Sequence, residues 1–133
     1  MPPSECVALE NLHNEDEVKN AVSSCWKTYI STYDTATSLH FRCRLDCRNI
    51  SISDIYTALE NGELQNVDAY GCKNAQKAAG LVEPCLEVWG ENKRGQLLCV
   101  ILALKVKQQK LMFVTAYQKK GGPKCDTDCD FKR

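Results

Sequence analysis

Apolar residues recur at helical spacing near the start of the chain and predict a helix over residues 15–30. The stripe consists of Val18, Ala21, Val22, Cys25, Trp26 and Tyr29. Asn14 stands directly before a run of acidic residues, which is typical of a helix start. An Asn side chain caps free backbone amides, and acidic groups favour the positive end of the helix dipole. The folded part of the chain is therefore expected to begin near residue 14.

The next segment predicts two further helices with a break between them. Residues 37–48 form the first of these helices, and residues 50–54 interrupt the pattern. Ser53 is predicted to cap a helix over residues 54–61, and Gly62 is predicted to end it.

Two other stretches lack a clear helical period. Residues 29–35 are rich in Tyr and Thr and predict a short strand or an extended connection. Residues 64–82 include Gly71 and Gly80 and predict a loop with one helical turn at most.

After Pro84 the pattern changes to strands. Residues 85–89, 96–106 and 110–118 are rich in β-forming residues, and a turn-like segment over 91–95 separates the first two. This order predicts an antiparallel meander. Because helices come first and strands second, the fold class is α+β, with N-terminal helices packed on a C-terminal antiparallel sheet of three to four strands.

The length of 133 residues fits one domain with a core of its own. We expect a flexible arm over residues 1–13, a single domain over 14–118 and a Cys-containing tail over 119–133. No apolar run reaches the length of a membrane span, and the first residues lack the basic-then-apolar order of a signal peptide. A cytoplasmic site of action is expected, and delivery into a target cell stays open.

Charge removes one simple argument for nucleic-acid binding. The chain has 17 basic and 17 acidic residues, so no global positive field attracts a phosphate backbone. A local cluster is needed instead. His40, Arg44 and Arg48 follow each other at four-residue intervals, so on a helix they form one stripe. Arginine binds phosphate bidentately and histidine transfers protons near neutral pH, but a solvated charged helix face has the same pattern.

The residues between His40 and Tyr117 resemble a domain family of unknown function that is affiliated with the BrnT and RelE toxins. The helix part of the resemblance is carried by His40, Arg42, Arg44, Arg48, Ile50, Ser51, Asp54, Ile55, Ala58, Leu59, Asn61, Gly62, Glu63 and Leu64. The strand part is carried by Val88, Trp89, Gly90, Gly95, the run Leu97–Leu104, Val114, Thr115, Ala116 and Tyr117. Asn49 departs from the family, because a turn glycine is typical there.

This resemblance implies a RelE-like fold and RNA cleavage without a metal or other cofactor, as in a toxin–antitoxin or interbacterial toxin system. On chemical grounds we expect His40 to act as general acid or base and Arg44 and Arg48 to bind phosphate. Thr115 and Tyr117 lie two residues apart and so share one strand face, where they are expected to position the substrate, or to be merely exposed polar residues. The partners implied are RNA and an antitoxin or immunity protein whose acidic residues cover the arginines.

The nine cysteines leave several states open. Cys43 and Cys47 share a helix face, and Cys125 and Cys129 repeat their spacing in the tail, so four thiolates could hold a structural zinc ion. Disulfides and unlinked thiols are the alternatives. Three further cysteines, Cys25, Cys85 and Cys99, are expected to be small core residues.

Two other functions fit the same residues. The first is a non-catalytic binding module on the same fold, with structural zinc or disulfide sites. The second is ADP-ribosyl transfer, which needs a catalytic glutamate, and for which Glu87 is the candidate on a strand.

Overall fold

The computed structural model describes residues 6, 9, 12, 14–37, 39–68 and 83–120, with the backbone alone for Leu39, His40 and Lys107. The elements are α1 (Glu15–Thr32), β1 (Asp34–Ala36), α2 (Leu39–Cys47), α3 (Ile52–Asn61), β2 (Glu63–Asp68), β3 (Cys85–Glu91), β4 (Leu97–Lys105), a 3₁₀ turn (Val106–Gln108) and β5 (Lys110–Gln118). The predicted α+β class is confirmed: three helices, mostly N-terminal, pack on a mostly antiparallel sheet.

The sheet is larger than the sequence predicts. Its five strands lie in the order β1-β5-β4-β3-β2, with β1 parallel to β5 and the other neighbours antiparallel. The meander of β3, β4 and β5 is confirmed, but the predicted count of three to four strands was wrong. The predicted loop over residues 64–82 was wrong as far as Asp68, because residues 63–68 pair with β3. The rest of that loop lies outside the described residues.

Local capping explains where two helices begin. The Asn14 side chain accepts hydrogen bonds from the backbone amides of Asp16 and Glu17, as predicted. The third helix begins earlier than expected, because Ser51 caps it in place of Ser53. Ser51 Oγ accepts from the Asp54 amide at 3.0 Å, and Asp54 Oδ2 accepts from the Ser51 amide at 2.9 Å, which is a complete capping box.

None of the described helices has the length and apolar character needed to span a bilayer.

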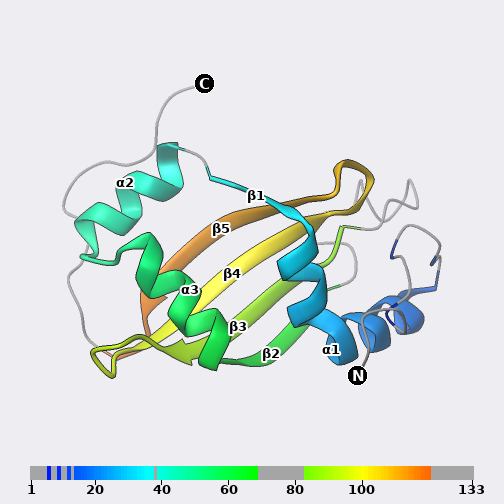
Figure 1. Cartoon of the computed structure of the whole chain (residues 1–133), viewed down its shortest axis with the longest axis horizontal. Helices are drawn as coiled ribbons and strands as arrows, with labels where there is room; N and C mark the ends of the chain where they lie inside the picture. Colours follow the sequence, from blue (N-terminus) through cyan, green and yellow to red (C-terminus); the bar gives the residue numbers. More distant parts are fainter. Residues whose placement is uncertain are drawn as a thin grey trace.

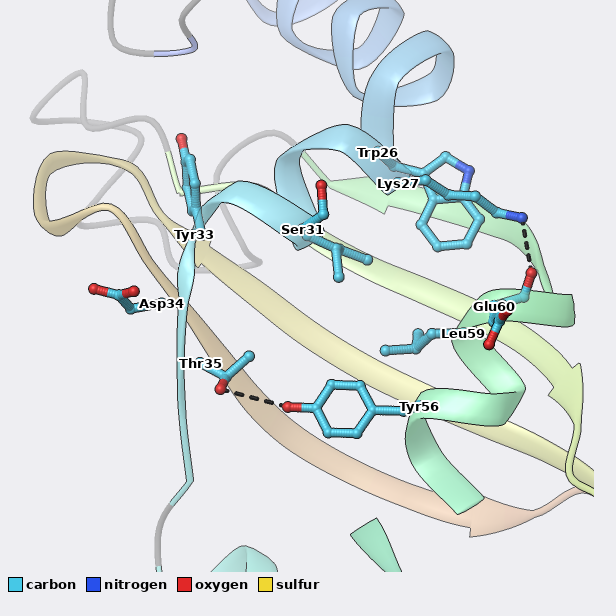
Figure 2. A pocket seen from close by; sticks show the side chains of 10 residues that line it. Trp26, Lys27, Ser31, Tyr33, Asp34, Thr35, Tyr56, Leu59 and Glu60 are labelled. Carbon is cyan, nitrogen blue, oxygen red and sulfur yellow. Dashed lines mark hydrogen bonds between the residues drawn. The ribbon is translucent and has the colours of Figure 1, made fainter. Parts of the chain in front are cut away.

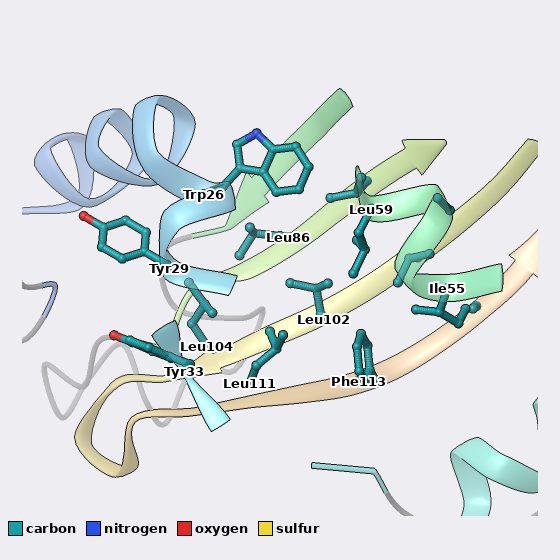
Figure 3. Close-up of a cluster of buried hydrophobic side chains, with 14 of the residues drawn as sticks. Trp26, Tyr29, Tyr33, Ile55, Leu59, Leu86, Leu102, Leu104, Leu111 and Phe113 are labelled. Carbon is teal, nitrogen blue, oxygen red and sulfur yellow. The ribbon is translucent and has the colours of Figure 1, made fainter. Parts of the chain in front are cut away.

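The helices cover one face of the sheet and build the core there (Figure 1). Alternate residues of the central strands point into it, as Leu86, Leu102, Leu104, Leu111 and Phe113 show in Figure 3. Aromatic contacts join the two layers. Phe113 stacks on Phe41 of α2 at 5.5 Å between ring centroids and meets Tyr56 of α3 edge-on at 6.1 Å. We call the opposite side of the sheet the outer face.

A β-bulge at Val114 decides which residues of β5 reach the outer face. Ile101 pairs with Thr115 and Leu102 with Phe113, so Val114 is an extra residue on β5. Leu111 and Phe113 point to the core, and strict alternation would send Thr115 there too. The extra residue reverses the alternation, so Ala116 is buried and Thr115 lies on the outer face.

Part of the predicted N-terminal arm contacts the core. Leu9 is buried, and Cys6 forms a disulfide with Cys25 of α1, with 6.0 Å between the Cα atoms. Cys25 was expected to be a small core residue. It is buried, and it is also bonded.

Candidate functional site on the outer face

The turn after α2 fixes the position of Arg48. The amide of Ile50 donates to the carbonyl of Leu45 at 2.9 Å, and the amide of Asn49 donates to the carbonyl of Asp46 at 3.2 Å. This pair of bonds is a Schellman motif, which needs a left-handed residue just after the helix. Asn49 supplies it with φ 58°. The asparagine that replaces the family's turn glycine is therefore compatible with the turn, because Asn tolerates this conformation.

Arg48 crosses from the end of α2 to the bulged part of β5. Its Nη1 donates to Thr115 Oγ1 at 3.1 Å and to the Ala116 carbonyl at 2.8 Å. These two bonds use both protons of Nη1. The side-on edge of the guanidinium, made of Nε and Nη2, has no hydrogen-bond partner within the described chain. A guanidinium held in this way offers two parallel donors to an oxyanion.

A series of hydrogen-bonded side chains crosses the outer face beside Arg48. Tyr117 pairs with Cys99 across β5 and β4, and the two side chains are hydrogen bonded. The Cys99 thiol donates to Glu87 Oε2 at 3.8 Å, and the indole N–H of Trp89 donates to the same oxygen at 2.7 Å. Because the thiol proton is directed at Glu87, the Tyr117 hydroxyl is the donor to the sulfur. Three strands thus hold one carboxylate in place.

Hydrogen bonding and burial keep the Tyr117 hydroxyl and the Cys99 thiol protonated. The hydrogen bond with Cys99, and then burial, raises the pKa of Tyr117 to about 12. Burial raises the pKa of the fully buried Cys99 thiol, and the Glu87 charge adds to this, while the bond from Tyr117 opposes it. The Tyr117 hydroxyl is therefore a neutral hydrogen-bond donor at physiological pH.

Positively charged side chains lie on two sides of this series of hydrogen-bonded side chains. Lys119 Nζ lies 4.1 Å from the centroid of the Trp89 ring and 5.8 Å from that of Tyr117. Burial lowers the pKa of Arg48, and the nearby charge of Arg44 lowers it further. An arginine stays protonated despite such a shift, so the Arg48 guanidinium and the Lys119 ammonium lie close enough to Tyr117 to act on it, and Arg44 adds positive charge near Arg48. This arrangement suits an anion that carries extra charge. We call Arg48, Thr115, Tyr117, Cys99, Glu87, Trp89 and Lys119 the outer-face cluster.

The structure brings together three of the five residues predicted for catalysis. Arg48, Thr115 and Tyr117 lie in the outer-face cluster, and Arg44 is near enough to Arg48 to act on its charge. The backbone of His40 lies in α2, but its side chain lies outside the described part of the structure.

The predicted zinc ligands are in a different state from the one that a zinc site needs. Cys43 and Cys47 are both disulfide-bonded, so neither is a thiolate here. Cys125 and Cys129 lie outside the described residues. Within the described chain, no three His, Cys, Asp or Glu side chains cluster closely enough to hold a metal ion.

Four members of the outer-face cluster were missed by the sequence reasoning. Glu87 was considered for ADP-ribosyl transfer alone, Cys99 was taken for a core residue, and Trp89 and Lys119 received no role. The spacing of these residues along the strands could have shown that some of them share a face of the sheet. Glu87 and Trp89 are two apart on one strand, as are Tyr117 and Lys119 near the end of another, so each pair shares a face.

A separate groove lies on the helix side of the sheet, between α1, β1 and α3 (Figure 2). Its volume is about 660 Å³, and Trp26, Ile30 and Leu59 form apolar walls. Two hydrogen bonds join parts of its rim: Lys27 Nζ donates to the Glu60 carbonyl at 3.0 Å, and the Tyr56 hydroxyl donates to Thr35 Oγ1 at 3.4 Å. None of the predicted catalytic residues whose side chains the structure describes lines this groove.

Comparison with known proteins places the chain in a family. A family model described as "Domain of unknown function (DUF4258)" matches residues 37–119. The chain belongs to the DUF4258 family. The matched range includes α2, the turn at Asn49 and every residue of the outer-face cluster. Searches of curated proteins and of solved structures give no significant match.

Proposed function

We propose that this DUF4258 protein is a toxin-type endoribonuclease of the RelE and BrnT kind and that the outer-face cluster is its active site. One observation carries the proposal. Arg48 is anchored on β5 by Nη1, which leaves its side-on edge without a hydrogen-bond partner in the described chain, and its charge is near enough to act on the neutral Tyr117 hydroxyl. A bound phosphodiester would take two hydrogen bonds from that edge.

The reaction that fits these groups is attack of a ribose 2′-oxygen on the neighbouring phosphorus. Glu87 takes the 2′-hydroxyl proton, the 2′-oxygen–phosphorus bond forms, and the bond to the 5′-oxygen breaks. The leaving oxygen takes a proton from His40, the donor predicted from the sequence. The products are a 2′,3′-cyclic phosphate and a 5′-hydroxyl. Arg44, Arg48 and Lys119 stabilise the additional negative charge of the transition state.

Disulfide bonding supports a delivered toxin in preference to a resident one. Cys6, Cys25, Cys43 and Cys47 are all disulfide-bonded, and such bonds persist mainly in oxidising compartments. A toxin that passes through such a compartment and acts in the cytoplasm of a target cell would satisfy both this and the need for RNA. Its producer would need an immunity protein, whose acidic residues would cover Arg44 and Arg48.

Cleavage of a labelled RNA by the purified, oxidised protein tests the proposal. We expect wild-type protein to leave 2′,3′-cyclic phosphate ends, and we expect Arg48→Ala and Glu87→Gln each to lower kcat at least 100-fold, because each removes a group that acts in the transition state. Arg42→Ala is the matched control. Arg42 is an exposed arginine on the same helix whose Nε bonds to Thr37 instead.

Growth of bacteria that express the same variants, with total RNA run on a gel, provides a second measurement. Arrest and RNA fragmentation by wild type and Arg42→Ala alone would support the proposal. Intact RNA and normal growth for all variants, with soluble oxidised protein present, would contradict it and favour the binding module.

A further inference from the structure

A second cavity adjoins the outer-face cluster and shares Trp89 with it. Its volume is about 390 Å³, and its lining includes Asn61, Glu63, Gln65, Trp89, Glu91 and Leu97. The indole N–H is bonded to Glu87, so the ring that forms one wall is fixed in orientation. Flat aromatic side chains at the end of a nucleic-acid site commonly stack against an unpaired base.

Two carboxylates flank the indole on the same face of the sheet. Glu63 is directly opposite Trp89 in the β2–β3 pairing, and Glu91 is two residues further along β3. Both side chains are exposed, and neither makes a hydrogen bond or ion pair in the described structure. They are acceptors of hydrogen bonds alone. No Lys or Arg of the described residues lines the cavity, so its described lining does not favour a phosphate group.

Carboxylates that only accept hydrogen bonds favour one of the four RNA bases over the others. Guanine is the base that presents two adjacent donors on its Watson–Crick edge, at N1 and at the 2-amino group, and one carboxylate accepts from both. Adenine and cytosine place an acceptor nitrogen at the centre of that edge, and uracil places carbonyl oxygens on both sides of its single donor. A carboxylate meets a repulsive oxygen or nitrogen in each of these three bases.

We infer that this cavity binds a guanine base, stacked against Trp89 and held by a carboxylate of Glu63 or Glu91. The inference rests on the proposed function for its role, because the base next to a phosphate at Arg48 and Lys119 would enter here. The protein would then cleave RNA beside guanine nucleotides. Correct pairing of two donors with one carboxylate is worth about a tenfold preference or more.

Binding of free nucleosides tests the inference without any need for cleavage. Guanosine, adenosine, cytidine and uridine are titrated into the oxidised wild-type protein, and Trp fluorescence reports the ring at Trp89, with Trp89→Phe to identify its signal. We expect guanosine to bind at least tenfold more tightly than the other three. Glu63→Gln with Glu91→Gln should remove this preference, and Glu60→Gln, an exposed glutamate outside the cavity, should retain it.

Mapping the ends of cleaved RNA separates this inference from the proposed function. Guanosine preference without cleavage would support the cavity and contradict the nuclease. Cleavage with equal use of all four bases, or equal binding of all four nucleosides, would overturn the guanine site and leave the nuclease standing. Loss of preference in Glu60→Gln would also overturn it, because the effect would then not belong to these two carboxylates.

Discussion

The two faces of the same three strands are built on different principles. On β4 the core side presents Leu98, Val100, Leu102 and Leu104, all fully buried and apolar. The outer side of the same meander presents a carboxylate, a thiol, an indole and a phenol joined by directional bonds. The core side depends on volume and close contact, whereas the outer side depends on hydrogen-bond geometry. A substitution should therefore affect stability mostly on one side and chemistry mostly on the other.

The largest expected effect is the loss of an aromatic ring from the core side. Phe113→Ala removes the contacts with Phe41 and Tyr56 and leaves a cavity, which should lower the free energy of unfolding by about 3–5 kcal/mol. The next residue is the control. Val114 has 45% of its surface exposed, so Val114→Ala should change stability by about 0.5 kcal/mol or less. Urea unfolding of both variants measures the difference, and equal losses would contradict a core-side role for Phe113.

The next effect comes from the close approach of α3 to β3. A Cβ at Gly90 would lie 2.8 Å from Gly62 Cα and closer still to the Ala58 carbonyl oxygen. These are backbone atoms that no rotamer change moves away, so Gly90→Ala should cost about 3 kcal/mol. Gly95→Ala is the control. Nothing crowds that site, but its φ of 76° disfavours a side chain, so we expect a loss of about 1 kcal/mol. A Gly90 variant as stable as the Gly95 variant would refute the close approach.

Arg48 tests the boundary between the two faces, because it contributes to both structure and chemistry. Arg48→Ala removes two hydrogen bonds from a charged donor to β5 and should cost about 1.5 kcal/mol of stability. Its effect on RNA cleavage should be far greater than this loss of stability explains. Urea unfolding and RNA cleavage assays on the same protein preparation measure the loss of stability and the loss of activity. A variant with normal cleavage but reduced stability would assign Arg48 to the fold alone.

The smallest effect is expected at Tyr117, in the way that stability changes with pH at high pH. The folded protein raises the pKa of Tyr117 to about 12, above its usual value near 10, so folding favours the protonated phenol. The stabilisation is complete below about pH 10 and is lost as the pH rises from 10 towards 12. Tyr117→Phe lacks this term, so its urea midpoint should fall less steeply than that of wild type between pH 9 and 11. Identical slopes would show that the shift is absent.

Local sequence patterns predicted the elements that are stabilised locally. The helix expected over residues 15–30 extends to Thr32, because its apolar period is long and regular. The strand β5 has the predicted bounds, because residues 110–118 are rich in β-forming residues. The strands β1 and β2 were missed or left open. The first is only three residues long, and a bulge at Gln65 breaks the alternation of the second. Both are defined mainly by pairing with strands far along the chain.

The candidate site was predictable only in part for the same reason. The four-residue spacing and the resemblance identified Arg48, and the two-residue spacing joined Thr115 to Tyr117. The link from Tyr117 through Cys99 to Glu87 depends on the register between β3, β4 and β5, which spacing within one strand does not contain. The cysteines illustrate the same limit, because identical spacing fits a zinc site and a disulfide framework equally well.

The extra residue at Val114 divides β5 into two halves that can vary separately. Before it, Leu111 and Phe113 must match the core in size, and after it, the outer residues are free of that demand. If Val114 paired regularly with Ile101 and formed no bulge, the two sets would be exchanged, so Thr115 and Tyr117 would enter the core. New chemistry can therefore evolve at the end of β5 by ordinary point substitutions, while the other half keeps the domain folded.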